Sequence, residues 1–134
     1  YSAIKIIRNL PKNGKLVTIE IDPAIAKVAK QNLKLAGMDD KATVIVGNAL
    51  KAISELKDKF DFVFIDAAKD LYLDYLLLLE KRNLLDKKAT ILADNVKMFK
   101  ADVEDYLEYV RTSGRYKSSY HDFGDDGMEV SERK

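Results

Sequence analysis

With 134 residues, of which 47% are hydrophobic, the chain can supply one domain with a single core. Lys and Arg (23) nearly balance Asp and Glu (22), so the formal charge of +1 argues against nucleic acid or an anionic membrane and favours a small-molecule partner. The sequence has no Cys, which excludes disulfides, thiolate zinc sites and Cys nucleophiles and favours a reducing compartment, here taken as the cytoplasm. Charged residues interrupt the most apolar run, around 76–79, so it is too short to span a bilayer.

The chain opens on "YSAIKIIRNL", whose apolar spacing predicts a helix over 1–10. In an alternating fold, a helix this early normally follows a first strand at the centre of the sheet. We therefore expect residues 1–134 to form a single but partial domain, with its first central strand missing from this chain or supplied by another chain.

Short apolar runs rich in β-branched residues then alternate with segments of helical period, which predicts an α/β fold with a mostly parallel sheet and right-handed crossovers. A turn at "GDDG" separates two final strands and predicts a closing antiparallel hairpin. The predicted strands are 15–22, 42–49, 60–67, 89–96, 116–123 and 128–133, and the predicted helices after the first are 23–36, 50–58, 71–85 and 101–113.

Polar residues follow two of the buried strands. Ligands of open α/β sheets bind beyond the carboxyl ends of the strands, where Asp66 ends one strand and Asp94 with Asn95 ends another. Carboxylate and amide oxygens suit Mg²⁺, or another divalent cation such as Ca²⁺ or Mn²⁺. Taken singly, each Asp would instead cap a helix or bond loop amides, but the pair followed by Asn favours a metal site.

Lys69 lies three residues after Asp66. A divalent cation within a few ångströms would disfavour the charged ammonium and lower the pKa of Lys69, so that the amine could accept a proton. The alternative is a solvated lysine on a turn. The spacing therefore makes Lys69 a candidate general base.

A second group of candidates follows the first two strands. Glu20 ends its strand where a carboxylate can accept hydrogen bonds from both hydroxyls of a ribose, as in nucleotide-type cofactor sites. The alternative is a helix N-cap contact, although Asp22, just before Pro23, is better placed for that. Gly47 and Asn48 would let the backbone approach a flat base, although that signal is weak by itself.

These residues resemble a known family, the class I S-adenosylmethionine-dependent O-methyltransferases, and within it the metal-dependent catechol O-methyltransferase type. The resemblance rests on "YSAIKI", "LVTIEIDP", "VFIDAAKDLYLDYLLLLEK", "ILADN" and "DDGMEV", which occur in the family's order and spacing from residue 1 to residue 134. It implies a Rossmann-like methyltransferase sheet. The family's helical lid, first strand and glycine-rich loop have no counterpart in the 134 residues.

The resemblance also implies roles for residues by position. It makes Lys69 the general base and Glu129 the acid that hydrogen-bonds one substrate hydroxyl. The residues matched to S-adenosylmethionine binding are Tyr1, Ser2, Glu20, Gly47, Asn48, Ala49 and Asp66, and those matched to magnesium are Asp66, Asp94 and Asn95. The catechol type carries bulky His and Trp where this chain has Ala67 and Ala68, so we expect a more open substrate wall, which Met98, Phe99 or His121 could line.

The function predicted from these residues is transfer of a methyl group from S-adenosylmethionine to a hydroxyl of a small vicinal diol aromatic, assisted by a divalent metal. Two other classes stay open at this point. One is a non-catalytic module that forms homo-oligomers through an open sheet edge. The other is a nicotinamide-dependent dehydrogenase, against which stand the absence of GxGxxG and the paired Asp66 and Asp94.

Overall fold

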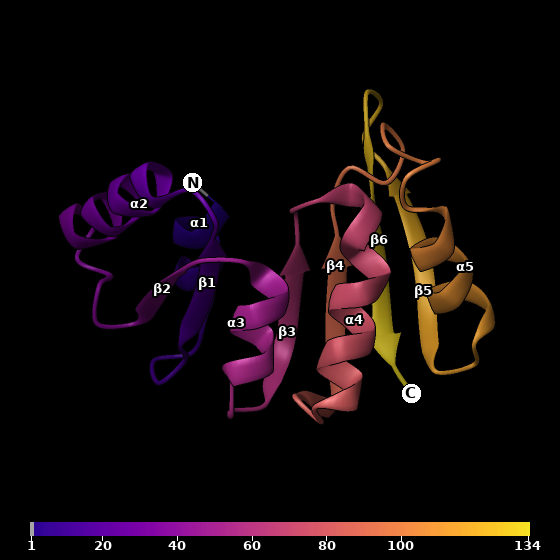
Figure 1. The fold of residues 1–134 in the computed structure, drawn as a ribbon, viewed down its shortest axis with the longest axis horizontal. Helices are drawn as coiled ribbons and strands as arrows, with labels where there is room; N and C mark the ends of the chain where they lie inside the picture. The colour runs from indigo at the N-terminus through magenta and orange to yellow at the C-terminus, as the bar shows by residue number, and fades with distance from the viewer. Residues whose placement is uncertain (1) are drawn as a thin grey trace. The chain divides into compact units, whose positions relative to one another are not determined.

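The computed structural model describes residues 2–134, and the chain divides into two compact units, 1–55 and 56–134. Each unit contains parallel β-strands joined by helices, as the alternating pattern predicts (Figure 1). The single domain over 1–134 stays a prediction.

The first unit is built on two parallel strands whose ends lie in register, with Glu20 opposite Val46. Its longest helix begins as the sequence indicates, because the Asp22 carboxylate accepts hydrogen bonds from the amides of Ala24 and Ile25 and Pro23 occupies the first turn. The elements are α1 (Ser2–Arg8), β1 (Leu16–Glu20), α2 (Pro23–Leu35), β2 (Ala42–Val46) and α3 (Ala49–Glu55).

The second unit is a four-stranded sheet in the order β3-β4-β6-β5. Strands β3 and β4 are parallel, and β6 runs antiparallel to both β4 and β5, which confirms the predicted C-terminal hairpin. Its elements are β3 (Phe60–Ile65), the 3-10 turn η1 (Lys69–Leu71), α4 (Tyr72–Lys81), β4 (Leu85–Ala93), α5 (Glu104–Thr112), β5 (Tyr116–Asp122) and β6 (Gly127–Arg133).

Helices α4 and α5 cover the same face of this sheet, and the core of the unit lies beneath them (Figure 1). Tyr72 of α4 and Tyr106 of α5 are fully buried and meet edge to face, with ring centroids 5.9 Å apart. Each aromatic ring removed from water contributes about 1.5–3 kcal/mol or more. The contact fixes the start of α4, and with it the segment that carries Lys69.

Two predicted boundaries differ in ways that matter for the site. The helix predicted over 71–85 ends at Lys81, and β4 starts at Leu85, four residues earlier than predicted. Strand β4 also ends at Ala93 rather than at residue 96, because Asn95 has a positive φ of 61° that extended strands do not tolerate. Asp94 and Asn95 therefore stand in a loop beyond the sheet.

Candidate active site

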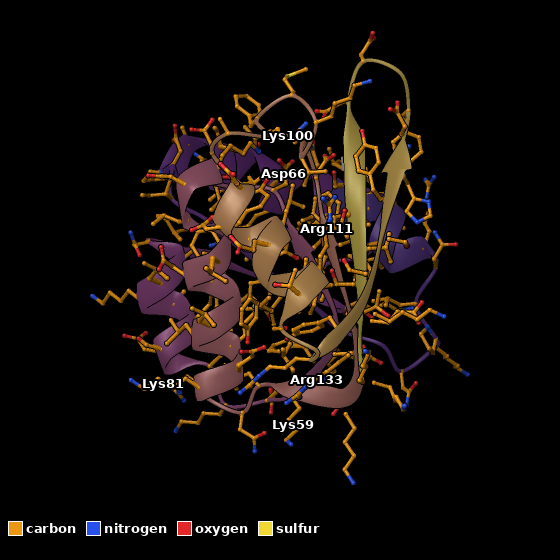
Figure 2. All side chains as sticks on the ribbon, turned by 90° about the vertical axis from the view of Figure 1, so that its right-hand side faces the viewer. Lys59, Asp66, Lys81, Lys100, Arg111 and Arg133 are labelled. Atoms are coloured by element: carbon orange, nitrogen blue, oxygen red, sulfur yellow. The ribbon has the colours of Figure 1, made fainter. Side chains whose placement is uncertain are left out.

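The ends of β3 and β4 bring Asp66 and Asp94 to the same edge of the sheet. The two strands are parallel and pair Ile65 with Ala93, so the residue that follows each strand leaves at the same level. The amide of Asp94 also donates to the carbonyl of Ile65 at 3.0 Å, which extends the ladder by one bond. Asp66 lies at the end of the unit opposite to Lys59 and Arg133 (Figure 2).

The ammonium of Lys69 donates hydrogen bonds to three side chains at this edge of the sheet. Its Nζ donates to Asp66 Oδ1 at 3.0 Å, to Asn95 Oδ1 at 3.0 Å and to the Tyr72 hydroxyl at 2.9 Å. The Tyr72 hydroxyl in turn donates to the carbonyl of Asp94 at 3.0 Å. Lys69 thus connects the end of β3 to the loop after β4, in keeping with its position three residues beyond Asp66.

The surroundings of Lys69 keep its amine protonated in this structure. Burial lowers the pKa of Lys69, but the hydrogen bonds to Tyr72 and Asp66 raise it more, and the net pKa lies above the ordinary 10.5. The Lys69 side chain is only 19% exposed, so the contact with Asp66 is partly shielded from water. A proton-accepting role therefore requires a change in the charge around the amine.

Asn95 belongs with Asp66, Lys69 and Tyr72 to one hydrogen-bonded group, called the cluster below. Its backbone has a left-handed conformation. Asn is one of the few residues other than Gly that adopts a positive φ readily. The backbone N–H of Asn95 donates to Asp94 Oδ1 at 2.8 Å, and the side-chain oxygen of Asn95 accepts from Lys69. The turn therefore presents the Asn95 amide, and holds the Asp94 carboxylate, at the same edge.

Asp126, in the turn between β5 and β6, completes the cluster. Its Oδ2 accepts from Asn95 Nδ2 at 2.7 Å, and its Oδ1 accepts from the backbone amides of Lys97, Met98 and Gly127 at 3.2, 3.0 and 2.8 Å. Partial burial raises the pKa of the Asp126 carboxyl, but these donors lower it more, so its pKa lies below the ordinary 3.8.

The sequence pattern did not single out Asp126 or Tyr72. Asp126 lies in "GDDG", which we interpret as a turn, and in "DDGMEV", which carries the resemblance without a role for Asp126. Tyr72 lies three residues after Lys69, the spacing at which side chains meet on a helical turn. Both residues join the cluster through contacts that only the folded chain shows.

The oxygens at this edge are of the chemical type that divalent cations bind. Asp66 Oδ1 and Asn95 Oδ1 each lie 3.0 Å from the same cationic nitrogen, so they converge on one point and lie within twice that distance of each other. Within residues 2–134, no three His, Cys, Asp or Glu side chains group as a metal site, whereas the predicted set has two carboxylates and an amide. Hard oxygen donors of this type suit Mg²⁺ completed by water.

In the first unit, the predicted cofactor residues Glu20, Gly47, Asn48 and Ala49 follow the ends of β1 and β2. The amide of Gly47 donates to the Glu20 carbonyl at 2.9 Å, which brings the two strand ends together. Gly47 has a φ of 148°, and a Cβ there would meet no atom within 4 Å, so the space beside it is open. A flat ligand can approach the backbone there.

The side chains of these residues already have local partners. Glu20 Oε1 accepts from the Asp22 amide at 3.1 Å. Asn48 Oδ1 accepts from the amides of Leu50 and Lys51 at 2.9 and 3.2 Å, so its side chain caps α3, whose first residue is Ala49. Ser2 is the exposed first residue of α1, and Tyr1 lies outside the described residues. Their cofactor roles stay predictions.

Glu129 does not join the cluster, and its role as a substrate contact stays a prediction. It lies on β6 opposite Ala93 with no exposed surface. Its two oxygens accept from Arg111 Nε at 3.0 Å and Nη2 at 2.8 Å, and Ser118 Oγ donates to it at 2.6 Å. In this structure the carboxylate is thus engaged by Arg111 of α5, which Figure 2 labels, and by the hydroxyl of Ser118.

Small and apolar residues surround the cluster. Ala67 and Ala68 are exposed, and the ring of Phe99, which is 37% exposed, lies with its centroid 5.4 Å from Lys69 Nζ. Met98 is also exposed, whereas His121 lies on β5 and contacts Ser119. Of the three residues considered for the substrate wall, Phe99 contacts the cluster through its side chain and Met98 through its backbone amide.

None of the helices formed by residues 2–134 is long and apolar enough to cross a membrane.

Comparison with known proteins places these features in a family. The sequence profile of a family described as O-methyltransferase matches residues 1–113. Catechol O-methyltransferase B of Danio rerio is 39% identical over 142 residues, covering 98% of this chain and 53% of that protein, and catechol O-methyltransferase of Sus scrofa is 40% identical over 140 residues, covering 96% and 74%. The crystal structure of the O-methyltransferase from Bacillus cereus in complex with SAH has a TM-score of 0.89 at 26% identity, over 100% of this chain and 69% of that one. The chain spans about half the length of most of the curated relatives it matches.

Proposed function

The chain belongs to the O-methyltransferase family, and on that premise we propose that its protein transfers a methyl group from S-adenosylmethionine to a hydroxyl of a small vicinal diol aromatic, with the help of a divalent cation. The α/β fold, with parallel strands and an antiparallel hairpin, is similar to solved O-methyltransferases, as predicted from the sequence. Relatives named catechol O-methyltransferase support the acceptor class.

One observation carries the proposal: a lysine amine and two oxygens of cation-binding type, from separate segments, converge at the carboxyl edge of a parallel strand pair. Asp66, Asp94 and Asn95 would hold the cation. When bound there, a divalent cation would lower the pKa of an acceptor hydroxyl near it and favour the oxyanion. Such a cation would also lower the pKa of Lys69, which is raised in its absence, because a positive neighbour lowers the pKa of an amine.

Lys69 would then act as the general base. Its Nζ would take the proton of one acceptor hydroxyl, and the oxyanion would then attack the methyl carbon of S-adenosylmethionine. The new C–O bond forms as the S–CH₃ bond breaks, which leaves a neutral thioether. The methyl group of S-adenosylmethionine is already activated, so the protein contributes chiefly position and charge. Tyr72 supports Lys69 by fixing its amine through the 2.9 Å contact.

The first unit would supply the cofactor contacts. The Glu20 carboxylate at the end of β1 is suited to the ribose hydroxyls, and the open space beside Gly47 suits a flat adenine. The SAH complex of the Bacillus cereus relative supports a cofactor of this type. Ala67, Ala68 and Phe99 would leave a wide, partly aromatic approach to Lys69 for the acceptor ring.

The test is a methylation assay with isotopically labelled S-adenosylmethionine and matched acceptors, 3,4-dihydroxybenzoate and 4-hydroxybenzoate, with Mg²⁺ or with EDTA. We expect methylation of the diol alone, and only with the metal. Asp66→Asn should lower turnover by about 100-fold, whereas Asp70→Asn, the same change at an exposed aspartate four residues away, should keep it within about twofold. Binding of S-adenosylmethionine without methylation of any diol would contradict the proposal.

A further inference from the structure

We propose that Asp126 is a positioning residue that fixes which way the side-chain amide of Asn95 faces, with the amide oxygen toward Asp66 and Lys69, where the proposed cation would bind, and the nitrogen toward the hairpin. The inference rests on the proposed function insofar as Asn95 is a metal ligand. Its geometric part, the orientation of the amide, stands on contacts within residues 56–134 alone.

The two ends of the Asn95 amide meet groups of opposite character. Its oxygen accepts from the Lys69 ammonium at 3.0 Å, and its nitrogen donates to the Asp126 carboxylate at 2.7 Å. A rotation of the amide by half a turn would place its NH₂ against the ammonium and its oxygen against the carboxylate. Both contacts would then be repulsive, so the orientation is determined from both sides.

The position of Asp126 is itself rigid. One of its oxygens accepts from the amides of Lys97, Met98 and Gly127, and the amide of Val96 donates to the carbonyl of Gly127 at 3.1 Å. The turn of the hairpin is therefore bound to the loop that follows β4. This leaves the second oxygen of Asp126 directed at Asn95 Nδ2.

Asp126→Asn is the sharpest perturbation, because it changes one atom group and keeps the shape. The oxygen of the substituted side chain would retain the three backbone donors, which places the new NH₂ against the NH₂ of Asn95. Asn95 would relieve this contact by turning its oxygen to the hairpin and its NH₂ to the cation position. A cation would thereby lose an oxygen ligand although Asn95 is unchanged.

The matched control is Asp122→Asn, the same substitution in the same hairpin. The Asp122 carboxylate accepts from the Gly124 amide at 2.7 Å and forms an ion pair with Lys97 at 3.2 Å, so its loss perturbs the turn without touching Asn95. Circular dichroism would check that both variants fold.

Two readouts separate the orientation from the metal site. The first is solvent exchange of the Asn95 Nδ2 protons, followed by NMR without metal. We expect protection in the wild type and in Asp122→Asn, and its loss in Asp126→Asn. Wild-type exchange as fast as that of the exposed Asn13 would overturn the proposal, even if Asp126→Asn fails to fold.

The second readout is the Kd for Mn²⁺, taken from the electron paramagnetic resonance signal of the free ion. Asp126→Asn should raise this Kd by about tenfold, as removal of a residue that orients a ligand commonly does, and Asp122→Asn should change it by no more than about twofold. An unchanged Kd in Asp126→Asn would overturn the positioning role. A wild type that binds no Mn²⁺ would instead refute the metal in the proposed function, and proton exchange would still decide the orientation.

Discussion

Replacing Lys69 by Met should have opposite effects on metal affinity and on turnover. Met keeps much of the length and volume of Lys but removes the ammonium, which now occupies Asp66 Oδ1 and Asn95 Oδ1 at 3.0 Å each. A cation bound by the same oxygens must compete with this ammonium and is repelled by it. The substitution therefore frees two ligands and removes a positive neighbour.

The magnitude follows from the contacts and their exposure. Hydrogen bonds to charged groups contribute about 1.5–3 kcal/mol, and the 42% exposure of the Asp66 side chain places this case toward the lower end. Lys69→Met should thus bind Mn²⁺ about tenfold more tightly, since about 1.4 kcal/mol corresponds to a factor of ten. Loss of the general base should lower turnover by about 10²- to 10⁴-fold at neutral pH.

Manganese titration and a single-turnover methylation assay would measure the two effects on the same preparations. Lys100→Met is the matched control, because Lys100 is exposed and lies at the same end of the unit as Asp66 (Figure 2). It should leave both quantities close to wild type. Weaker or equal Mn²⁺ binding by Lys69→Met would show that the amine does not compete for the ligand oxygens, and unchanged turnover would refute its role as base.

Two further predictions concern stability. Arg111→Met should lower the free energy of unfolding by about 3–5 kcal/mol in urea titrations, because it leaves the fully buried Glu129 carboxylate without its cation. The control is Arg115→Met, at a largely exposed side chain. A similar loss of stability in the two variants would show that the Arg111–Glu129 ion pair contributes little. Burial, followed by the hydrogen bond to Glu80, raises the pKa of Tyr109 from 10.0 to about 12, so the stability that this phenol contributes is fully present below pH 10.0 and is lost as the pH rises through about 12. Tyr109→Phe should flatten the decline of stability over that interval, and an identical decline would contradict the assignment.

The fold was predictable because its signals are local. The strands are short buried runs, and the helices between them carry a clear apolar period, so element types and the parallel β3–β4 pair follow from the sequence. The end of β4 was placed too late, because the β-branched Val96 follows Asp94 and Asn95 and the positive φ of Asn95 leaves no trace in hydrophobicity. The sequence pattern alone therefore leaves the extent of the loop after β4 undetermined.

The convergence of the side chains was predictable where it depends on strand ends and not where it depends on the hairpin, and the roles of these residues stay predictions. Asp66, Lys69 and Asn95 converge because parallel strands end at one edge. The burial of Glu129 could not be predicted, because β6 alternates polar and apolar residues in "MEVS" and a lone Glu in a hairpin is ordinarily on the surface. Instead Arg111 of α5 reaches over the sheet and neutralises it, a long-range pairing that no local pattern encodes.

The left-handed backbone at Asn95 restricts how the metal preference of such a protein could be redesigned. At a φ of 61°, Asn, Asp and Gly are accommodated with little strain, whereas β-branched and bulky side chains are not. Softer metals are commonly recruited by introducing imidazole or thiolate donors, and at this position a Cys thiolate would have to overcome the backbone, whereas His is among the residues that adopt a positive φ more often. Attempts to retune selectivity should therefore begin at Asp66, whose backbone is free of this constraint.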